Sequence, residues 1–252
     1  MKEFQILMQS ASKKRRTPFL PFRVSFLQMR RPMPRKTLIR SSVQPYHVTA
    51  RCNNRDPFFV DSEEVWRVFS WHLNEAVKEF QIKIHAFVLM PNHFHLLVST
   101  PEDDLGVVMQ KFISSVTKTL NFKSGRTGRV FGARYHWSLV DSLDYYDCVQ
   151  KYVYRNPVKA GLSARVEDYP FSTLGGVLGN RRVFFPLHPP SENQSLVPHE
   201  NPVEFLTWLN QPFGKEQDEA IRKGFKKKKF LPSKTGWKRL PAKSETVHDE
   251  SV

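Results

Sequence analysis

The sequence predicts an α+β fold, in which a four-stranded antiparallel sheet carries its helices on one face in the ferredoxin-like plan. Three observations predict it. Short segments rich in β-branched and aromatic residues alternate with longer segments whose apolar residues recur at helical spacing. Their order along the chain is β-α-β-β-α-β, and one more helix follows. Such an order is typical of an antiparallel sheet whose connecting helices pack on the same side.

The first predicted strand is residues 44–50, which read Gln-Pro-Tyr-His-Val-Thr-Ala and are rich in strand-forming residues. An Asn-Asn-Arg-Asp-Pro turn follows it. A helix is expected from Asp61, because acidic residues occupy its first turn and Val65 and Phe69 stand at helical spacing. The chain therefore begins its core with one strand and the first connecting helix.

Two further strands are predicted at residues 82–90 and 93–100, and a Pro-Asn turn separates them. Both are almost continuously apolar. The second one begins with two histidines that flank a phenylalanine. We therefore expect two apolar strands joined by a turn, with the histidines at the start of the second strand.

Three more elements complete the predicted core. Apolar residues at helical spacing predict a helix over residues 105–120, and a basic loop with two glycines leads to a fourth strand at residues 130–140. A last helix is expected from about residue 143 to residue 155, because Ser142 can cap its start and Pro157 stops it.

The charge of the chain points to its partners. Its 252 residues are 40% apolar, which is ordinary for a globular protein, but the formal net charge at pH 7 is +15 and the isoelectric point is near 9.9. A surface with this excess of cations attracts polyanions, and nucleic acid is the first candidate. The charge by itself carries no sequence specificity.

The two cysteines, Cys52 and Cys148, are far apart in the sequence. This spacing is neither a disulfide framework nor a zinc-binding pattern, so we expect a reduced, cytoplasmic protein. No apolar run has the length of a membrane span, and no membrane partner is expected.

The sequence predicts three regions. Residues 1–32 are a basic, loosely ordered extension, and residues 33–175 form the folded domain. Residues 176–252 are rich in proline at first and are expected to be irregular, with one short amphipathic helix at residues 202–209. A basic tail with four consecutive lysines, Lys226–Lys229, follows that helix.

The two histidines of the hairpin are the first candidates for chemistry. Successive side chains of a strand alternate between its faces, so His93 and His95 project from one face and Phe94 from the other. Two imidazoles in this position can share a metal ion. The alternative is a pair of half-buried histidines at the end of a strand, and the spacing alone leaves both interpretations open.

The last helix holds a second candidate pair. Tyr152 and Asn156 are four residues apart, so their side chains are neighbours on one helix face. A tyrosine beside a cation can act as a nucleophile, and the amide oxygen of asparagine is a ligand that suits Mg²⁺ or Mn²⁺. Alternatively, Tyr152 is a core residue and Asn156 only ends the helix.

Three motifs occur in order along the chain: Tyr-His-Val-Thr at residues 46–49, Met-Pro-Asn-His-Phe-His at residues 90–95, and Tyr-Val-Tyr-Arg-Asn-Pro-Val at residues 152–158. Together they resemble the REP-associated tyrosine transposases. These are HUH single-strand transposases, which use one catalytic tyrosine. The resemblance covers about residues 33–175. A weaker similarity extends over the tail, although the lysine run replaces the glycines and prolines common there.

The resemblance implies a role for each candidate. His93, His95 and Asn156 would bind Mg²⁺ or Mn²⁺, and Tyr152 would be the nucleophile. The implied activity is that of a metal-dependent transposase and endonuclease. It cleaves and rejoins single-stranded DNA next to hairpins through a 5′-phosphotyrosine intermediate, as a monomer or a homodimer. The main alternative is a non-catalytic protein, derived from a transposase, that binds a DNA hairpin or sequence. A hydrolase of small phosphoesters would not need so basic a surface.

Four further residues are candidates for DNA binding. Arg126, Arg129 and Arg134 lie around the glycine-containing loop, where guanidinium groups could hold phosphates, or where the loop could simply be solvated. His47 on the first strand could lie near the site. Among the other tyrosines, Tyr145 is the main rival nucleophile, because it lies two turns before Tyr152 on the same helix face.

Overall fold

The computed structural model describes residues 37–102, 104–188 and 201–232. Within them, four strands form one sheet in the order β2-β3-β1-β4, and all neighbouring strands are antiparallel. The strands are β1 (Tyr46–Arg51), β2 (Lys83–Met90), β3 (His93–Ser99) and β4 (His136–Leu139). The predicted α+β fold with a four-stranded antiparallel sheet is confirmed. The predicted basic extension at residues 1–32 lies outside the described residues.

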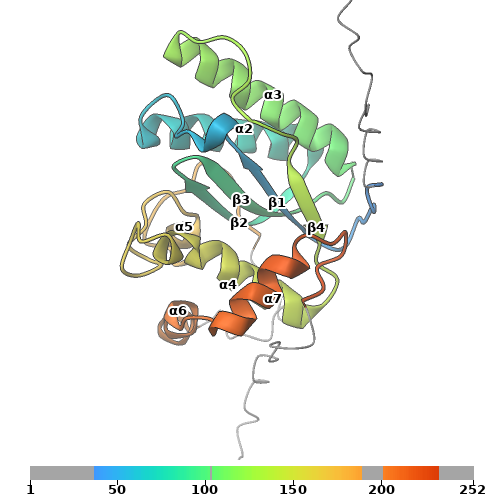
Figure 1. Ribbon diagram of the computed structural model, residues 1–252, viewed down its shortest axis with the longest axis vertical. Helices are drawn as coiled ribbons and strands as arrows, with labels where there is room; N and C mark the ends of the chain where they lie inside the picture. Colours follow the sequence, from blue (N-terminus) through green and yellow to red (C-terminus); the bar gives the residue numbers. More distant parts are fainter. Residues whose placement is uncertain (1–36, 103, 189–200, 233–252) are drawn as a thin grey trace, which may run out of the picture. The chain divides into compact units, whose positions relative to one another are not determined.

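Two helices, α2 (Ser62–Phe80) and α3 (Leu105–Ser124), cover one face of the sheet, as the sequence predicts (Figure 1). Each begins at an aspartate that caps it. The Asp61 carboxylate accepts a hydrogen bond from Glu64 N at 2.9 Å, and the Asp104 carboxylate accepts one from Gly106 N at 2.6 Å. No helix of the described residues has the length and apolarity needed to cross a lipid bilayer.

The core under α2 and α3 is aromatic. Phe94 of β3 packs its ring 5.5 Å from that of Phe69 in α2 and 6.0 Å from that of Phe112 in α3, measured between ring centroids. Both of its neighbours in the strand, His93 and His95, project from the opposite face. The period-two geometry of the strand therefore separates a dry aromatic core from the histidine face.

The opposite face of the sheet is covered by α4 (Leu143–Lys159), which packs on apolar side chains of β2 and β3, including Val88 and Leu97 (Figure 1). The prediction that the helices lie on one face therefore holds for α2 and α3 but not for α4. The prediction that Pro157 ends this helix near residue 155 is wrong. The helix continues to Lys159, because the N–H that proline lacks falls in the last turn and costs only one hydrogen bond. Ala160 N–H then donates to Asn156 O at 3.0 Å and closes the helix end.

The fourth strand is shorter than predicted. Residues 130–140 were expected to be strand, but β4 contains only His136–Leu139. Phe131 pairs with Cys52 in an isolated bridge, and the chain leaves the sheet at Gly132. There the backbone runs so close to β1 and the turn after it that a Cβ at Gly132 would lie 3.0 Å from Cα of Asn53. Gly132 N–H still donates to Arg51 O at 3.1 Å, and regular pairing with β1 resumes only at His136.

The carboxyl-terminal region is more ordered than the sequence predicts. It contains the predicted amphipathic segment as α6 (Pro202–Asn210), together with α5 (Leu174–Val177) and the unpredicted α7 (Lys215–Gly224). After α7 the backbone runs beside β4: Leu139 N–H donates to Lys228 O at 2.9 Å, and Phe230 N–H donates to Leu139 O at 2.7 Å. The lysine run therefore lies along the edge of the sheet, and the expectation of an irregular tail is wrong for these residues.

Phe230 anchors this segment, and its removal tests how much the segment stabilises the fold. The side chain is fully buried and packs against Phe225, with ring centroids 4.7 Å apart. We expect Phe230→Ala to lower the free energy of unfolding by about 3–5 kcal/mol, because it leaves a cavity. Urea denaturation measures this loss. Phe122→Ala is the matched control: that ring is 87% exposed, so a change below about 0.5 kcal/mol is expected. Equal effects of the two variants would contradict the anchoring role.

Candidate functional site

The histidine pair lies at the start of β3 on the face toward α4. The ring centroids of His93 and His95 are 5.0 Å apart, with the two planes at 78°. His95 is buried, and His93 is partly exposed at the end of the strand. The two imidazoles are therefore close enough for one ion to contact both.

Packing of α4 on this face brings Tyr152 to the histidines. Its ring centroid lies 5.7 Å from that of His95 and 6.0 Å from that of His47. Asn156 is one turn further along the helix, where its Nδ2 donates to Tyr152 O at 2.8 Å. This bond uses the amide nitrogen, so the carbonyl oxygen Oδ1 is the atom of Asn156 suited to bind a cation.

The first strand contributes a third histidine. His47 lies on β1 beside β3, and its Nε2 is 3.0 Å from Nδ1 of His95. Both rings are buried, and their planes differ by only 17°, which suits a hydrogen bond in the plane of the two rings. His47 was predicted as a possible neighbour of the site, and the structure places it in direct contact with the histidine pair.

Sequence reasoning missed one residue of this cluster. The ring of Phe225, which follows α7, lies 4.1 Å from that of His47 and 4.8 Å from that of Tyr152, measured between centroids. A phenylalanine just before a lysine run is the only signal for it in the sequence, and that signal does not indicate where the ring packs. The segment after α7 thus covers the aromatic side of the cluster.

Burial controls the protonation of the cluster. It lowers the pKa of His47 to about 3 and that of His93 to about 4, and it lowers the pKa of His95 well below the ordinary 6.5. All three imidazoles are therefore neutral at physiological pH, which is the form that binds metal ions. Burial also raises the pKa of Tyr152, while the positive charges of Arg222 and Arg51 oppose this rise.

The donor atoms present fit a divalent cation. Nε2 of His95 is buried and has no hydrogen-bond partner among the described residues. This orphaned nitrogen and the neighbouring His93 imidazole are suited to bind one ion, and Asn156, one turn after Tyr152 on α4, is the candidate for an amide-oxygen ligand. Among the described residues, no group of three or more His, Cys, Asp or Glu side chains is arranged to hold a metal ion, at this site or at another, so a third ligand here would have to be of another kind.

The predicted arginines lie apart from the ring cluster. Arg126, Arg129 and Arg134 are exposed in the connection between α3 and β4. The guanidinium of Arg126 stacks on Phe59, with its carbon 3.6 Å from the ring centroid. The structure therefore leaves these three residues as surface cations and does not bring them into the contacts of the histidine–tyrosine cluster.

The other tyrosines of α4 have different neighbours. Tyr145, the rival nucleophile, packs its ring on Phe230 with centroids 5.4 Å apart. The hydroxyl of Tyr154 lies 3.3 Å from Oγ1 of Thr173. Of these three tyrosines, Tyr152 is the one whose ring contacts His95 and His47.

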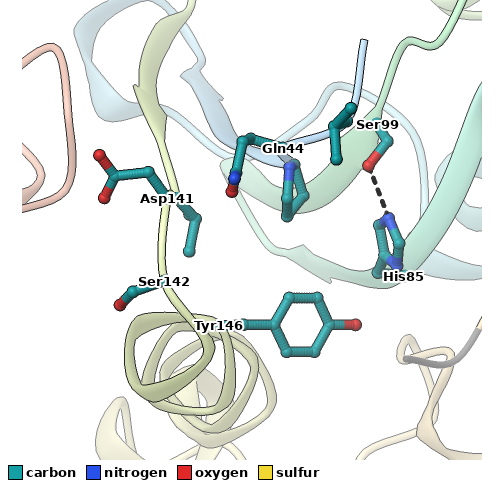
Figure 2. Close-up of a pocket in the computed structure, with 9 residues that line it drawn as sticks. Gln44, His85, Ser99, Asp141, Ser142 and Tyr146 are labelled. Atoms are coloured by element: carbon teal, nitrogen blue, oxygen red, sulfur yellow. Dashed lines mark hydrogen bonds between the residues drawn. The ribbon is translucent and has the colours of Figure 1, made fainter. Parts of the chain in front are cut away.

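A separate pocket of about 270 Å³ lies elsewhere in the fold, between the start of β1 and the start of α4. Figure 2 shows His85 on one wall, where its Nε2 lies 2.9 Å from the hydroxyl of Ser99, and Tyr146 of α4 on another. None of the predicted site residues lines this pocket. The pocket is therefore a feature distinct from the site.

Comparison with known proteins finds that part of this chain is similar to one family of transposases. Residues 41–156, which include every member of the cluster except Phe225, match the family model described as IS200-like transposase. A REP-associated tyrosine transposase of Escherichia coli strain K12 is 29% identical over 94 residues, which cover 36% of this chain. The predicted resemblance is confirmed.

The similarity to the tyrosine transposases is partial. The chain spans about half of the length of the Escherichia coli protein, 54%. A solved structure, described as the REP-associated tyrosine transposase bound to a REP hairpin, is similar with a TM-score of 0.49 and 20% sequence identity. That similarity covers 64% of this chain and 94% of the solved one.

Buried neutral histidines make the stability of the fold depend on pH. Burial lowers the pKa of His85 from 6.5 to about 4. Because the unfolded chain binds protons at higher pH than the folded one, the free energy of unfolding falls as pH falls from 6.5 to 4. This one group contributes about 3 kcal/mol at most. Denaturant unfolding at a series of pH values measures it.

The matched variant is His85→Gln, which removes the titrating group and keeps a side chain that forms hydrogen bonds. Its free energy of unfolding should depend less steeply on pH between 6.5 and 4 than that of the wild type. Parallel curves for the two proteins would show that His85 is not held neutral by burial.

Proposed function

We propose that this protein cleaves and rejoins single-stranded DNA next to hairpins, through a 5′-phosphotyrosine on Tyr152, with the help of a divalent cation. The observation that carries the proposal is the position of the Tyr152 ring, 5.7 Å from the centroid of His95 on the face that α4 covers. A phenol and an imidazole pair meet there, with the Asn156 amide one helical turn after the phenol, in a region that matches the IS200-like transposases.

His93, His95 and Asn156 would hold the cation, Mg²⁺ or Mn²⁺. When bound, this ion would polarise the phosphoryl oxygens and offset the charge that develops on them. The chain's own contribution is to keep both imidazoles neutral by burial and to place the Asn156 amide on the same helix face as the nucleophile.

In the proposed reaction, the hydroxyl oxygen of Tyr152 attacks the scissile phosphorus. A bond forms between phosphorus and the phenol oxygen, and the bond to the 3′ oxygen breaks. The phenol proton is lost and the leaving oxygen ends as a 3′-hydroxyl. Attack of another 3′-hydroxyl on the phosphotyrosine reverses these changes and joins two strands without ATP. Packing between α4 and Phe225 holds the tyrosine ring for this attack.

DNA binding would rest on surface cations outside the cluster. Lys226, Lys227, Lys228 and Lys229 are exposed and follow the edge of β4, where backbone hydrogen bonds hold them. The ammonium of Lys229 is 3.2 Å from the Asp141 carboxylate. A row of lysines on an ordered edge suits a phosphate backbone, and the exposed arginines after α3 extend the basic surface.

Replacing the nucleophile tests the reaction. Tyr152→Phe should abolish the SDS-resistant adduct that forms with a labelled single-stranded hairpin in the presence of Mn²⁺. Hairpin affinity should stay within about threefold, because phosphate contacts dominate binding. Tyr145→Phe is the matched control on the same helix and should still form the adduct. An adduct that survives Tyr152→Phe would reject this nucleophile. Unchanged binding with no adduct from the wild type would favour a non-catalytic hairpin-binding protein.

Replacing lysines tests the basic edge. The double variant Lys227→Gln and Lys228→Gln should bind single-stranded DNA more weakly and with a shallower dependence on salt. The slope of log affinity against log salt should fall by about 0.7 for each phosphate that a lysine no longer neutralises. Fluorescence anisotropy at several salt concentrations measures the slope. Lys118→Gln on α3 removes an exposed lysine from the other face of the sheet as a control. Equal slopes for the control and the double variant would place the DNA elsewhere.

A further inference from the structure

We propose that His47 and Asn92 are positioning residues, which set the tautomers of His95 and His93 so that both histidines present Nε2 to one divalent cation. The inference rests on the proposed function and deepens it. It assigns a task to two residues that bind neither the cation nor the DNA in that proposal. Each of the two lies against the Nδ1 atom of one histidine of the pair.

The tautomer of His93 follows from Asn92. Nδ2 of Asn92 donates to the backbone carbonyl of Arg55 at 2.6 Å, so the amide oxygen is the group turned to the histidine. That oxygen, Oδ1, lies 2.7 Å from Nδ1 of His93. An amide oxygen only accepts hydrogen bonds, so Nδ1 of His93 carries the hydrogen. In the neutral ring, Nε2 then keeps its lone pair.

The tautomer of His95 follows from His47. One hydrogen lies between Nε2 of His47 and Nδ1 of His95, and either ring could donate it. If His47 donated, the neutral His95 would carry its own hydrogen on Nε2. That atom is buried and has no acceptor among the described residues. If His95 donates, Nε2 holds a lone pair instead, which is what a bound cation needs.

The surroundings of His47 hold it in this role. It lies on β1, which pairs with β3 along its whole length, so the position of His47 relative to His95 is fixed by backbone hydrogen bonds. Phe225 also packs on its ring, with centroids 4.1 Å apart. Histidines that bind metals usually donate their second ring hydrogen to a fixed acceptor, and loss of this acceptor lowers metal affinity about 10–100-fold. His47 and Asn92 are such acceptors.

Three variants of the full-length protein test the inference through Mn²⁺ affinity, measured by calorimetry. His47→Phe keeps an aromatic ring but removes the acceptor, so Mn²⁺ should bind about 10–100-fold more weakly. His47→Gln keeps an oxygen that can accept the hydrogen, so its affinity should stay within about threefold of the wild type. His72→Phe is the matched control, because His72 pairs with Thr119 between α2 and α3, on the other face of the sheet. It should bind Mn²⁺ as the wild type does.

A second measurement reads the tautomers directly in the metal-free wild type. Long-range ¹H–¹⁵N correlation spectra of the imidazoles should show hydrogen on Nδ1 of both His93 and His95. Assignment of hydrogen to Nε2 of His95 would overturn the inference, and so would unchanged Mn²⁺ affinity in His47→Phe. This readout needs no variant, so a misfolded His47→Phe leaves the inference testable. Failure of the proposed function looks different: the wild type would bind no Mn²⁺ although both tautomers are as assigned.

Discussion

The packing of α4 on the histidine face of the sheet is the interaction on which the proposed chemistry depends. The apolar side chains of Val149 and Val153 are fully buried in the core between the helix and the sheet. Tyr152 lies between them in the sequence and is carried to the edge of that core, where the sheet presents His95. Displacement of the helix would therefore separate the nucleophile from the imidazoles, although every residue of the site would still be present.

Later segments of the chain complete the sheet at both edges. Beside β2, Leu89 N–H donates to Phe171 O and Thr173 N–H donates to Phe87 O, each at 2.9 Å. Beside β4, the segment that ends in Phe230 pairs with Leu139. Both outer strands thus have backbone partners, which removes the unpaired edges that favour aggregation. The segment at β4 also delivers Phe225 to the site, so the order of the tail and the shape of the cluster are connected.

The basic surface residues and the histidine–tyrosine cluster occupy different parts of the protein. The site is a group of neutral rings, of which His47 and His95 are buried and His93 and Tyr152 partly buried, and burial disfavours both imidazolium and phenolate. The lysines Lys226–Lys229 and the arginines Arg126, Arg129 and Arg134 lie exposed on the surface, along β4 and in the connection after α3. In the proposed function, the basic surface attracts DNA over a distance that shortens as the salt concentration rises. The ring cluster then acts only on the phosphate that reaches it.

The sequence by itself determined the local geometry of each candidate. The alternation of His93, Phe94 and His95 and the four-residue spacing of Tyr152 and Asn156 follow from the periods of strand and helix, which need no tertiary contact. Only the tertiary structure decided which of these faces meet. The contacts of His47 with His95 and of Phe225 with Tyr152 join residues far apart in the chain. They arise from strand pairing and core packing, which no local pattern encodes. The order of the lysine run was decided in the same way, because the buried Phe230 and the pairing with Leu139 outweigh the local preference of a run of like charges.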